Sequence, residues 1–362
     1  MQEIIPNRVK ISPFLVFYLV VSMQVGIGVL GYQRIIAKYA GQDSWISVLI
    51  AGLFLHIITW MMYKIAETVD GDIVSAHQYI IGNIGGRLLS SIFIPYYFIF
   101  SLTVLLTYLE IIHVWMFPSL STFWFTFALM LICIYIVYGG FRTVVGIAFF
   151  GITLPFYLFL TFGDTLKYAQ IENILPIWSH SIKDLLLGAY QMSLTFIGFE
   201  TILFFYPFIK NPKKSKKWAH LGLLFTTLLY TGFMLITIFY YSYDELQKSV
   251  WATLTMWKIV EFPFVERFEY IGIASWYLVI LPNICIPIWI SSRLLKRIVN
   301  LRQKKGVLLI AISILIAVLL FDTRDRINVL NNFTAKMGFT FIALYIPVLF
   351  ICVMIKKKVK KQ

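Results

Sequence analysis

The chain is dominated by apolar runs that are long enough to cross a lipid bilayer. A stretch of about 17 to 25 apolar residues spans the hydrocarbon core as a helix. Only 13% of the 362 residues are charged, against roughly 25% in soluble domains. We therefore predict an all-α polytopic membrane protein, surrounded by membrane lipid, in which residues 1–362 form a single transmembrane domain. Ten transmembrane segments are expected, at about 13–36, 44–66, 88–116, 120–138, 143–162, 184–209, 217–241, 266–298, 305–322 and 337–355.

The distribution of Lys and Arg predicts how these segments are oriented. Basic residues concentrate in the cytoplasmic loops of membrane proteins, and an even number of segments puts both termini on one side. With the termini inside, roughly 21 of the 31 basic residues fall on the cytoplasmic side, including the tail 356–362. Both termini are therefore predicted to be cytoplasmic. Anionic lipid head groups account for the net charge of +14, so no nucleic-acid partner is expected.

Two segments contain glycines near their centres. Gly26 and Gly28 interrupt the first segment, and Gly198 interrupts the sixth. Glycine lets a helix unwind, although small residues in membranes also serve simply to let helices pack closely. Paired interruptions in the two halves of a chain point to a transporter-type binding site. We therefore predict two five-helix repeats, at about 13–162 and 184–355.

One carboxylate lies within the sixth segment at membrane depth. Glu200 follows the glycine break in a run that is otherwise apolar or uncharged from Leu185 to Ile209. A charge at the bilayer centre costs at least roughly 2.5 kcal/mol, whereas the positive end of a half-helix stabilises an anion. Glu200 is therefore either a ligand-binding residue or a structural residue that satisfies the unwound backbone, and the sequence leaves both interpretations open.

The outer connection 242–265 carries apolar residues at helical spacing, namely Val250, Leu254, Trp257 and Val260. This pattern predicts one amphipathic helix over the outer mouth of the bundle. Such a helix could act as a lid, and an interfacial loop without a gating role remains the alternative.

The sequence lacks the motifs of common catalytic and metal sites. It contains no G-x-S-x-G, no H-E-x-x-H and no Walker glycine loop. Its three cysteines lie within apolar runs and have no C-x-x-C spacing. We therefore expect no enzyme activity, no metal ion and no cofactor.

The motifs around the two breaks resemble those of a known transporter superfamily. F-x-G-F-E at 196–200 followed by K-N-P at 210–212 is similar to the sixth helix of amino acid/polyamine/organocation transporters, and G-x-G at 26–28 is similar to their first helix. Within this superfamily the chain most resembles the spore germination permeases, the B subunits of endospore germinant receptors. That closer resemblance rests on the compact length, the ten segments, Glu110 late in the third segment and the opening PNRVKISPFLVFYLVVSMQVGIGVL. The sequence departs from typical amino acid transporters at 206–208, where an acidic pair often precedes K-N-P.

The resemblance implies a fold and a binding site. The fold would be two inverted five-helix repeats with the first and sixth helices broken, and a pocket between the first, third, sixth and eighth helices. An amino acid would place its carboxylate on freed N–H groups of the first helix and its ammonium near carbonyls of the first and sixth, which agrees with the polarity of half-helix ends. A tryptophan at Gly28 would then fill the pocket without preventing folding. The candidate ligand-binding residues are Gly26, Ile27, Gly28, Phe100, Thr103, Val104, Phe196, Ile197, Gly198, Glu200, Ser275 and Val279.

The resemblance also implies a location and partners. The location would be the spore inner membrane, with both termini on the side of the spore core. The partners would be a small-molecule nutrient, an A subunit and a lipoprotein C subunit. Three functions stay open: a nutrient-sensing receptor subunit, a proton- or ion-coupled amino acid transporter, and a structural subunit with a vestigial pocket. Related proton-coupled transporters often have a lysine in the fifth helix, and sodium-coupled ones need hydroxyls in the eighth. Residues 143–162 contain no lysine and the eighth segment offers only Ser275 before its cytoplasmic end, which favours the receptor.

Overall fold

The chain folds into a bundle of helices. The structure, a computed structural model, describes residues 5–260, 263, 265–321 and 323–360. Within these ranges there is no strand, and an isolated backbone bridge joins Ile11 to Ile209. A helix satisfies its backbone hydrogen bonds within its own segment, which is what a bilayer requires. The predicted all-α class is confirmed.

The number of membrane-spanning helices is less well defined than the fold class. Six helices of the described chain are long and apolar enough to cross a membrane, and a pair bent by 47°, Ile182–Gln191 with Ser193–Phe208, raises this number to seven. The apolar helices α1 (Leu15–Gln24) and α6 (Thr122–Tyr138) are shorter. The count of ten therefore stays a prediction. Apart from the last helix, described below, the longer helices outside the broken segments are α3 (Ser44–Val69), α4 (Ile73–Ser91), α5 (Phe93–Trp115), α6 (Thr122–Tyr138), α7 (Phe141–Thr153), α12 (Lys216–Tyr240), α15 (Phe268–Val299) and α16 (Gln303–Val318).

The first predicted segment is a broken helix. It consists of α1 (Leu15–Gln24), the 3₁₀ turn η2 (Ile27–Leu30) and α2 (Tyr32–Ala40). Between α1 and η2 the backbone leaves helical geometry at Val25 (φ −80°, ψ 105°) and Gly26 (φ −153°, ψ −136°). The break therefore lies at the glycines from which it was predicted.

The sixth predicted segment is broken as well. It consists of α9 (Ile182–Gln191), α10 (Ser193–Phe196) and, beyond the break, the short helical turns η7 (Phe199–Thr201), α11 (Ile202–Phe205) and η8 (Tyr206–Phe208). Ile197 is extended and Gly198 has φ +116°, a left-handed conformation that favours glycine. The predicted second break is therefore confirmed.

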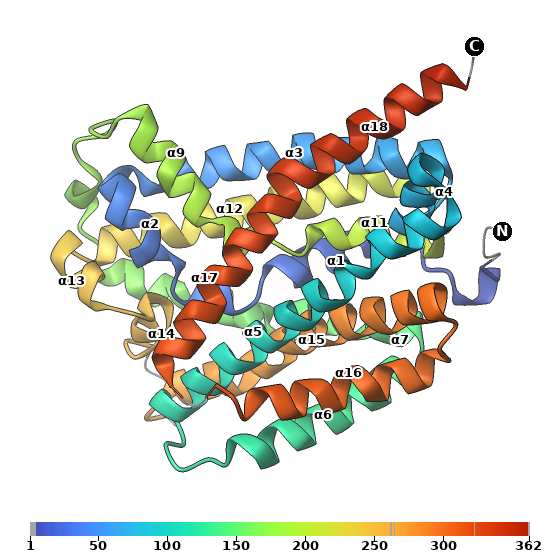
Figure 1. The fold of residues 1–362 in the computed structure, drawn as a ribbon. Coiled ribbons are helices and arrows are strands. Elements are labelled where there is room, and N and C mark those ends of the chain that lie inside the picture. Colours follow the sequence, from blue (N-terminus) through green and yellow to red (C-terminus); the bar gives the residue numbers. More distant parts are fainter. Residues whose placement is uncertain (1–4, 261–262, 264, 322, 361–362) are drawn as a thin grey trace.

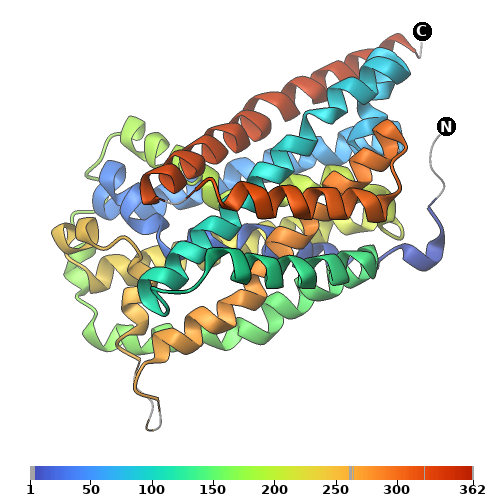
Figure 2. The same ribbon diagram turned by 60° about the horizontal axis from the view of Figure 1, so that its bottom comes forward.

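The two broken helices run in opposite directions, as Figure 1 shows. Ile11, just before α1, receives a hydrogen bond from the Lys210 N–H and donates one to the Phe208 carbonyl, both at 2.8 Å. The start of the first broken helix therefore meets the end of the second, the relation expected of inverted repeats. Both chain ends lie at the same end of the bundle (Figures 1 and 2).

The last helix begins earlier than predicted. The expected segment was 337–355, whereas α17 (Arg324–Thr340), the π-helical turn η10 (Phe341–Tyr345) and α18 (Ile346–Val359) form one continuous helix. The first turns of α17 contain Arg324, Asn328 and Asn331, so the search for apolar runs missed them. The helix continues into the predicted tail 356–362, of which 361 and 362 lie outside the described residues.

The outer connection forms two short helices and not the single helix that was predicted. These are α13 (Tyr243–Lys248) and α14 (Ala252–Trp257). Leu254, Trp257 and Val260 are buried, so much of the predicted apolar face packs onto the bundle. Residues 261, 262 and 264 of this connection lie outside the described residues.

Candidate functional site

The two breaks pack directly against the opposite broken helix. A Cβ atom at Gly198 would lie 2.6 Å from the Met23 carbonyl oxygen, and a Cβ atom at Gly28 would lie 3.0 Å from Thr195 Cα. Glycine is therefore needed at both positions for close approach. A tryptophan at Gly28 would push against the α10 backbone, contrary to the expectation that it only fills a pocket.

The unwound carbonyls of the first broken helix are satisfied by side chains from neighbouring helices. Burying these carbonyls without partners would cost about 1–3 kcal/mol each. The amide of Asn283 on α15 donates to Ser22 O (2.9 Å) and Val25 O (3.3 Å), the Tyr230 hydroxyl donates to Gln24 O (2.8 Å), and the Trp276 indole donates to Gly26 O (3.2 Å). These are carbonyls near which the resemblance put a ligand ammonium, and each already accepts a hydrogen bond. This role of Asn283 at the first broken helix was not predicted from the sequence.

Glu200 lies in the second break and is completely buried. Its Oε2 accepts a hydrogen bond from the Gly198 N–H at 2.6 Å, and its Oε1 accepts one from the Tyr96 hydroxyl on α5 at 2.9 Å. The carboxylate thus satisfies a backbone group that the unwinding exposes. This geometry corresponds to the structural alternative for Glu200.

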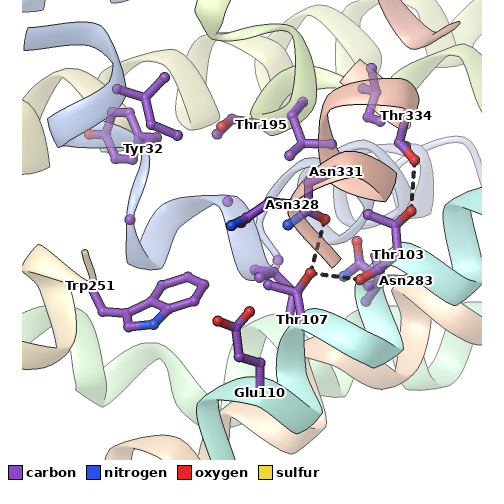
Figure 3. Close-up of a pocket in the computed structure, with 18 of the residues that line it drawn as sticks. Tyr32, Thr103, Thr107, Glu110, Thr195, Trp251, Asn283, Asn328, Asn331 and Thr334 are labelled. Carbon is purple, nitrogen blue, oxygen red and sulfur yellow. Dashed lines mark hydrogen bonds between the residues drawn. The ribbon is translucent and has the colours of Figure 1, made fainter. Parts of the chain in front are cut away.

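A cavity of about 180 Å³ lies between the two broken helices, α5, α15 and α17 (Figure 3). A cavity of about 150 Å³ binds benzene, so this cavity admits a small organic molecule. Trp251, from the segment before α14, and Glu110 of α5 both lie at this cavity. The cavity lies toward the end of the bundle away from the two termini.

The cavity brings together some of the predicted site residues and leaves out others. Seven of them are in its lining: Gly26, Ile27, Gly28, Phe100, Thr103, Val104 and Ile197. Five are not: Phe196, Gly198, Glu200, Ser275 and Val279.

Predicted site residues outside the cavity lining have other contacts. The Phe196 carbonyl accepts a hydrogen bond from Gln24 Nε2 (3.1 Å), and the Ser275 hydroxyl pairs with the Tyr157 hydroxyl (2.7 Å). Val279 is fully buried. The eighth predicted helix, α15, reaches the cavity through Asn283.

The last helix supplies a polar wall that the sequence reasoning missed. Arg324, Asn328, Asn331 and Thr334 of α17 all line the cavity. Their spacing of four, three and three residues puts them on one helical face. Arg324 and Asn328 are exposed, Asn331 is half-buried and Thr334 is buried, so the wall runs from the mouth to the floor. The same spacing in the sequence could have revealed it.

Three side-chain pairs join this wall to α5. Arg324 Nε lies 3.3 Å from Glu110 Oε1 at the mouth. Deeper in, the Thr107 hydroxyl donates to Asn331 Oδ1 (3.0 Å), and the hydroxyls of Thr103 and Thr334 pair at 2.7 Å. The charged pair therefore lies at the mouth, and neutral hydrogen-bonding groups line the interior (Figure 3).

The cavity has the chemical character of a binding site for a small polar molecule. It combines neutral amides and hydroxyls with apolar side chains such as Ile27, Phe100 and Ile197, the mixture typical of small-molecule sites. Among the described residues, no group of three or more His, Cys, Asp or Glu side chains could hold a metal ion.

Comparisons with known proteins agree with the fold and identify the family. The family described as spore germination protein matches residues 10–328. The chain is 41% identical to spore germination protein GerQB of Bacillus cereus over 357 residues, which is 99% of both chains. It is 26% identical to spore germination protein B2 of Bacillus subtilis (strain 168) over 261 residues, 70% of both chains.

A solved structure shows the same fold. It is a Na⁺-coupled sialic acid symporter in a substrate-bound outward-open state, with a TM-score of 0.66 and 13% identity, covering 94% of this chain and 79% of the symporter. At this identity the likeness concerns the fold alone, and the fold is that of a transporter and not of an enzyme family. The full-length relative and the family match together give the identity: the chain is an integral membrane protein that belongs to the spore germination permease family.

Proposed function

We propose that this chain is the nutrient-sensing membrane subunit of a germinant receptor. It binds a small polar molecule, in the first place an amino acid, in the cavity between the two broken helices. The cavity is the observation that supports the proposal most directly. It has polar and apolar walls, lies where the two helices are broken, and occurs in a spore germination permease with a transporter fold. The ligand contacts are backbone N–H groups of Gly26, Ile27 and Gly28 and side chains of α5.

The location and partners follow from the same proposal. The chain acts in the spore inner membrane, with both termini on the core side, and the cavity faces the side from which nutrients arrive. An A subunit and a lipoprotein C subunit complete the receptor. Ligand binding changes the packing of the broken helices, and the partner subunits detect that change. No catalytic step is involved.

An ion- or proton-coupled amino acid transporter is the second candidate function. The likeness to a Na⁺-coupled symporter favours it. Against it, the Ser275 hydroxyl of α15 pairs with Tyr157 and does not line the cavity, and the fifth predicted segment has no lysine. The receptor is therefore the preferred proposal.

The experiment that tests the proposal is nutrient-triggered loss of heat resistance in spores of the source organism. Spores with and without this gene are exposed to common amino acids, hexoses and ribonucleosides. The receptor proposal predicts that deletion abolishes the response to one nutrient class. If every response is unchanged, and vegetative cells lose uptake of an amino acid instead, the transporter replaces the receptor.

A further inference from the structure

Selection among small molecules requires side chains that face the cavity and still have hydrogen-bonding capacity. The eighth predicted helix does not supply them, because the one α15 residue in the lining is Asn283. Its amide nitrogen donates to three backbone carbonyls, those of Ser22, Val25 and Val279. Asn283 therefore holds the break of the first helix in place and has little capacity left for a ligand.

The polar wall of α17 differs in this respect. Asn331 Oδ1 lies 3.0 Å from the Thr107 hydroxyl oxygen, which also lies 2.8 Å from the Thr103 carbonyl oxygen. Asn328 and Asn331, three residues apart on α17, both line the cavity (Figure 3). Within the described part of the chain, no hydrogen bond engages the Asn331 Nδ2 group or the Asn328 amide. A primary amide offers two donors on its nitrogen and two acceptor positions on its oxygen, so both side chains keep hydrogen-bonding capacity for a ligand.

The remaining surroundings of these amides restrict the ligand further. Arg324 pairs with Glu110 of α5 at the mouth, so the charged side chain of this wall already has a partner. Thr103 and Thr334 are paired at the floor. Apolar side chains, among them Ile27, Val104 and Leu194, contribute other parts of the lining. A matching molecule is apolar on one side and carries hydrogen-bond acceptors on the other.

We propose that Asn328 and Asn331 of α17 determine which nutrient the cavity accepts. The ligand class is a molecule whose carbonyl, hydroxyl or ring-nitrogen acceptors receive hydrogen bonds from these amides. This inference rests on the proposed sensing function and deepens it. It assigns selectivity to the last helix, which holds none of the site residues predicted from the sequence.

The test uses two variants in intact spores. Asn328→Ala removes an amide at the exposed mouth, where little packing depends on it. Asn331→Asp keeps an oxygen within reach of Thr107 and replaces the N–H donors by a second, negatively charged carboxylate oxygen. The matched control is Asn332→Asp, since Asn332 is the next residue of the same helix but is exposed and absent from the cavity lining.

The readout is the concentration of each nutrient that gives half-maximal loss of heat resistance, with receptor abundance measured in spore membranes. Loss of one hydrogen bond predicts a shift of up to roughly tenfold for a nutrient that uses it. The order of preference among amino acids, hexoses and ribonucleosides changes in both variants and not in the control. A purely structural role would weaken all responses equally and leave that order intact.

Two outcomes overturn the inference in distinguishable ways. If wild-type spores respond through this gene and both variants keep the wild-type order and concentrations, the α17 assignment is wrong and the sensing function stands. If deletion of the gene alters no nutrient response, the proposed function fails, and the inference fails with it.

Discussion

The hydrogen bonds of Glu200 predict what removal of this side chain does. Glu200→Ala leaves two buried donors without an acceptor, the Gly198 N–H and the Tyr96 hydroxyl. An unsatisfied buried donor costs about 1–3 kcal/mol, so the free energy of unfolding falls by about 2–6 kcal/mol. Glu200→Gln keeps one carbonyl oxygen as an acceptor but faces the other donor with an N–H group, and its expected loss is about 1–3 kcal/mol.

Two neighbouring tyrosines provide a matched control for this prediction. Tyr96→Phe removes a hydroxyl that donates to Glu200, whereas the Tyr97 hydroxyl is buried and has no partner within the described residues. Tyr96→Phe is therefore expected to destabilise the protein by about 1–3 kcal/mol. Tyr97→Phe removes an unsatisfied polar group and is expected to be neutral or stabilising.

The assay is thermal unfolding of the purified protein in detergent, followed by tryptophan fluorescence. The expected order of midpoints is wild type, then Glu200→Gln, then Glu200→Ala, with the exposed Glu172→Gln equal to wild type. An unchanged midpoint for Glu200→Ala, together with a changed preference among nutrients, would refute the structural assignment and make Glu200 a ligand contact.

Three further predictions, the first with a control variant on α12, concern the breaks and the mouth of the cavity. Gly198→Ala combines φ +116° with a contact of 2.6 Å to the Met23 carbonyl, so it lowers the unfolding midpoint by the equivalent of at least about 1–3 kcal/mol. A Cβ atom at Gly232 on α12 meets no atom within 4 Å. As a control, Gly232→Ala therefore raises the free energy of unfolding by up to about 1 kcal/mol and the midpoint slightly. Asn283→Ala frees the carbonyls of Ser22 and Val25, and a loss of about 1–3 kcal/mol per carbonyl is expected in the same assay. Arg324→Gln breaks an ion pair with Glu110 in which the Arg324 side chain is 50% exposed. The free energy of unfolding therefore falls by no more than about 1 kcal/mol, and a larger fall would show that the pair holds α17 in place.

The sequence predicted the parts of the fold that depend on apolar length and on glycine. Both breaks were found because only glycine tolerates the close approaches at Gly28 and Gly198. The all-α class followed from the composition. These features are local, and a single residue type or run reveals each of them.

The polar wall was missed because it contradicts the rule that was used to find helices. A hydropathy criterion requires an apolar run, but α17 begins with Arg324 and carries Asn328 and Asn331. These residues face the cavity and not lipid, so their polar side chains avoid the free-energy cost of contact with hydrocarbon. The contacts of Asn283 with the first helix could not be predicted either, because they join residues about 260 positions apart through packing alone.

The central claim is that a nutrient binds in the cavity between the broken helices. Val104 lines this cavity and is 9% exposed, so Val104→Phe enlarges a lining side chain without introducing a polar group. The decisive measurement is the nutrient dose–response of spores that carry this variant at wild-type receptor abundance. We predict that the response to the nutrient sensed through this gene is lost or shifted to a higher concentration. An identical dose–response in variant and wild-type spores would contradict the claim.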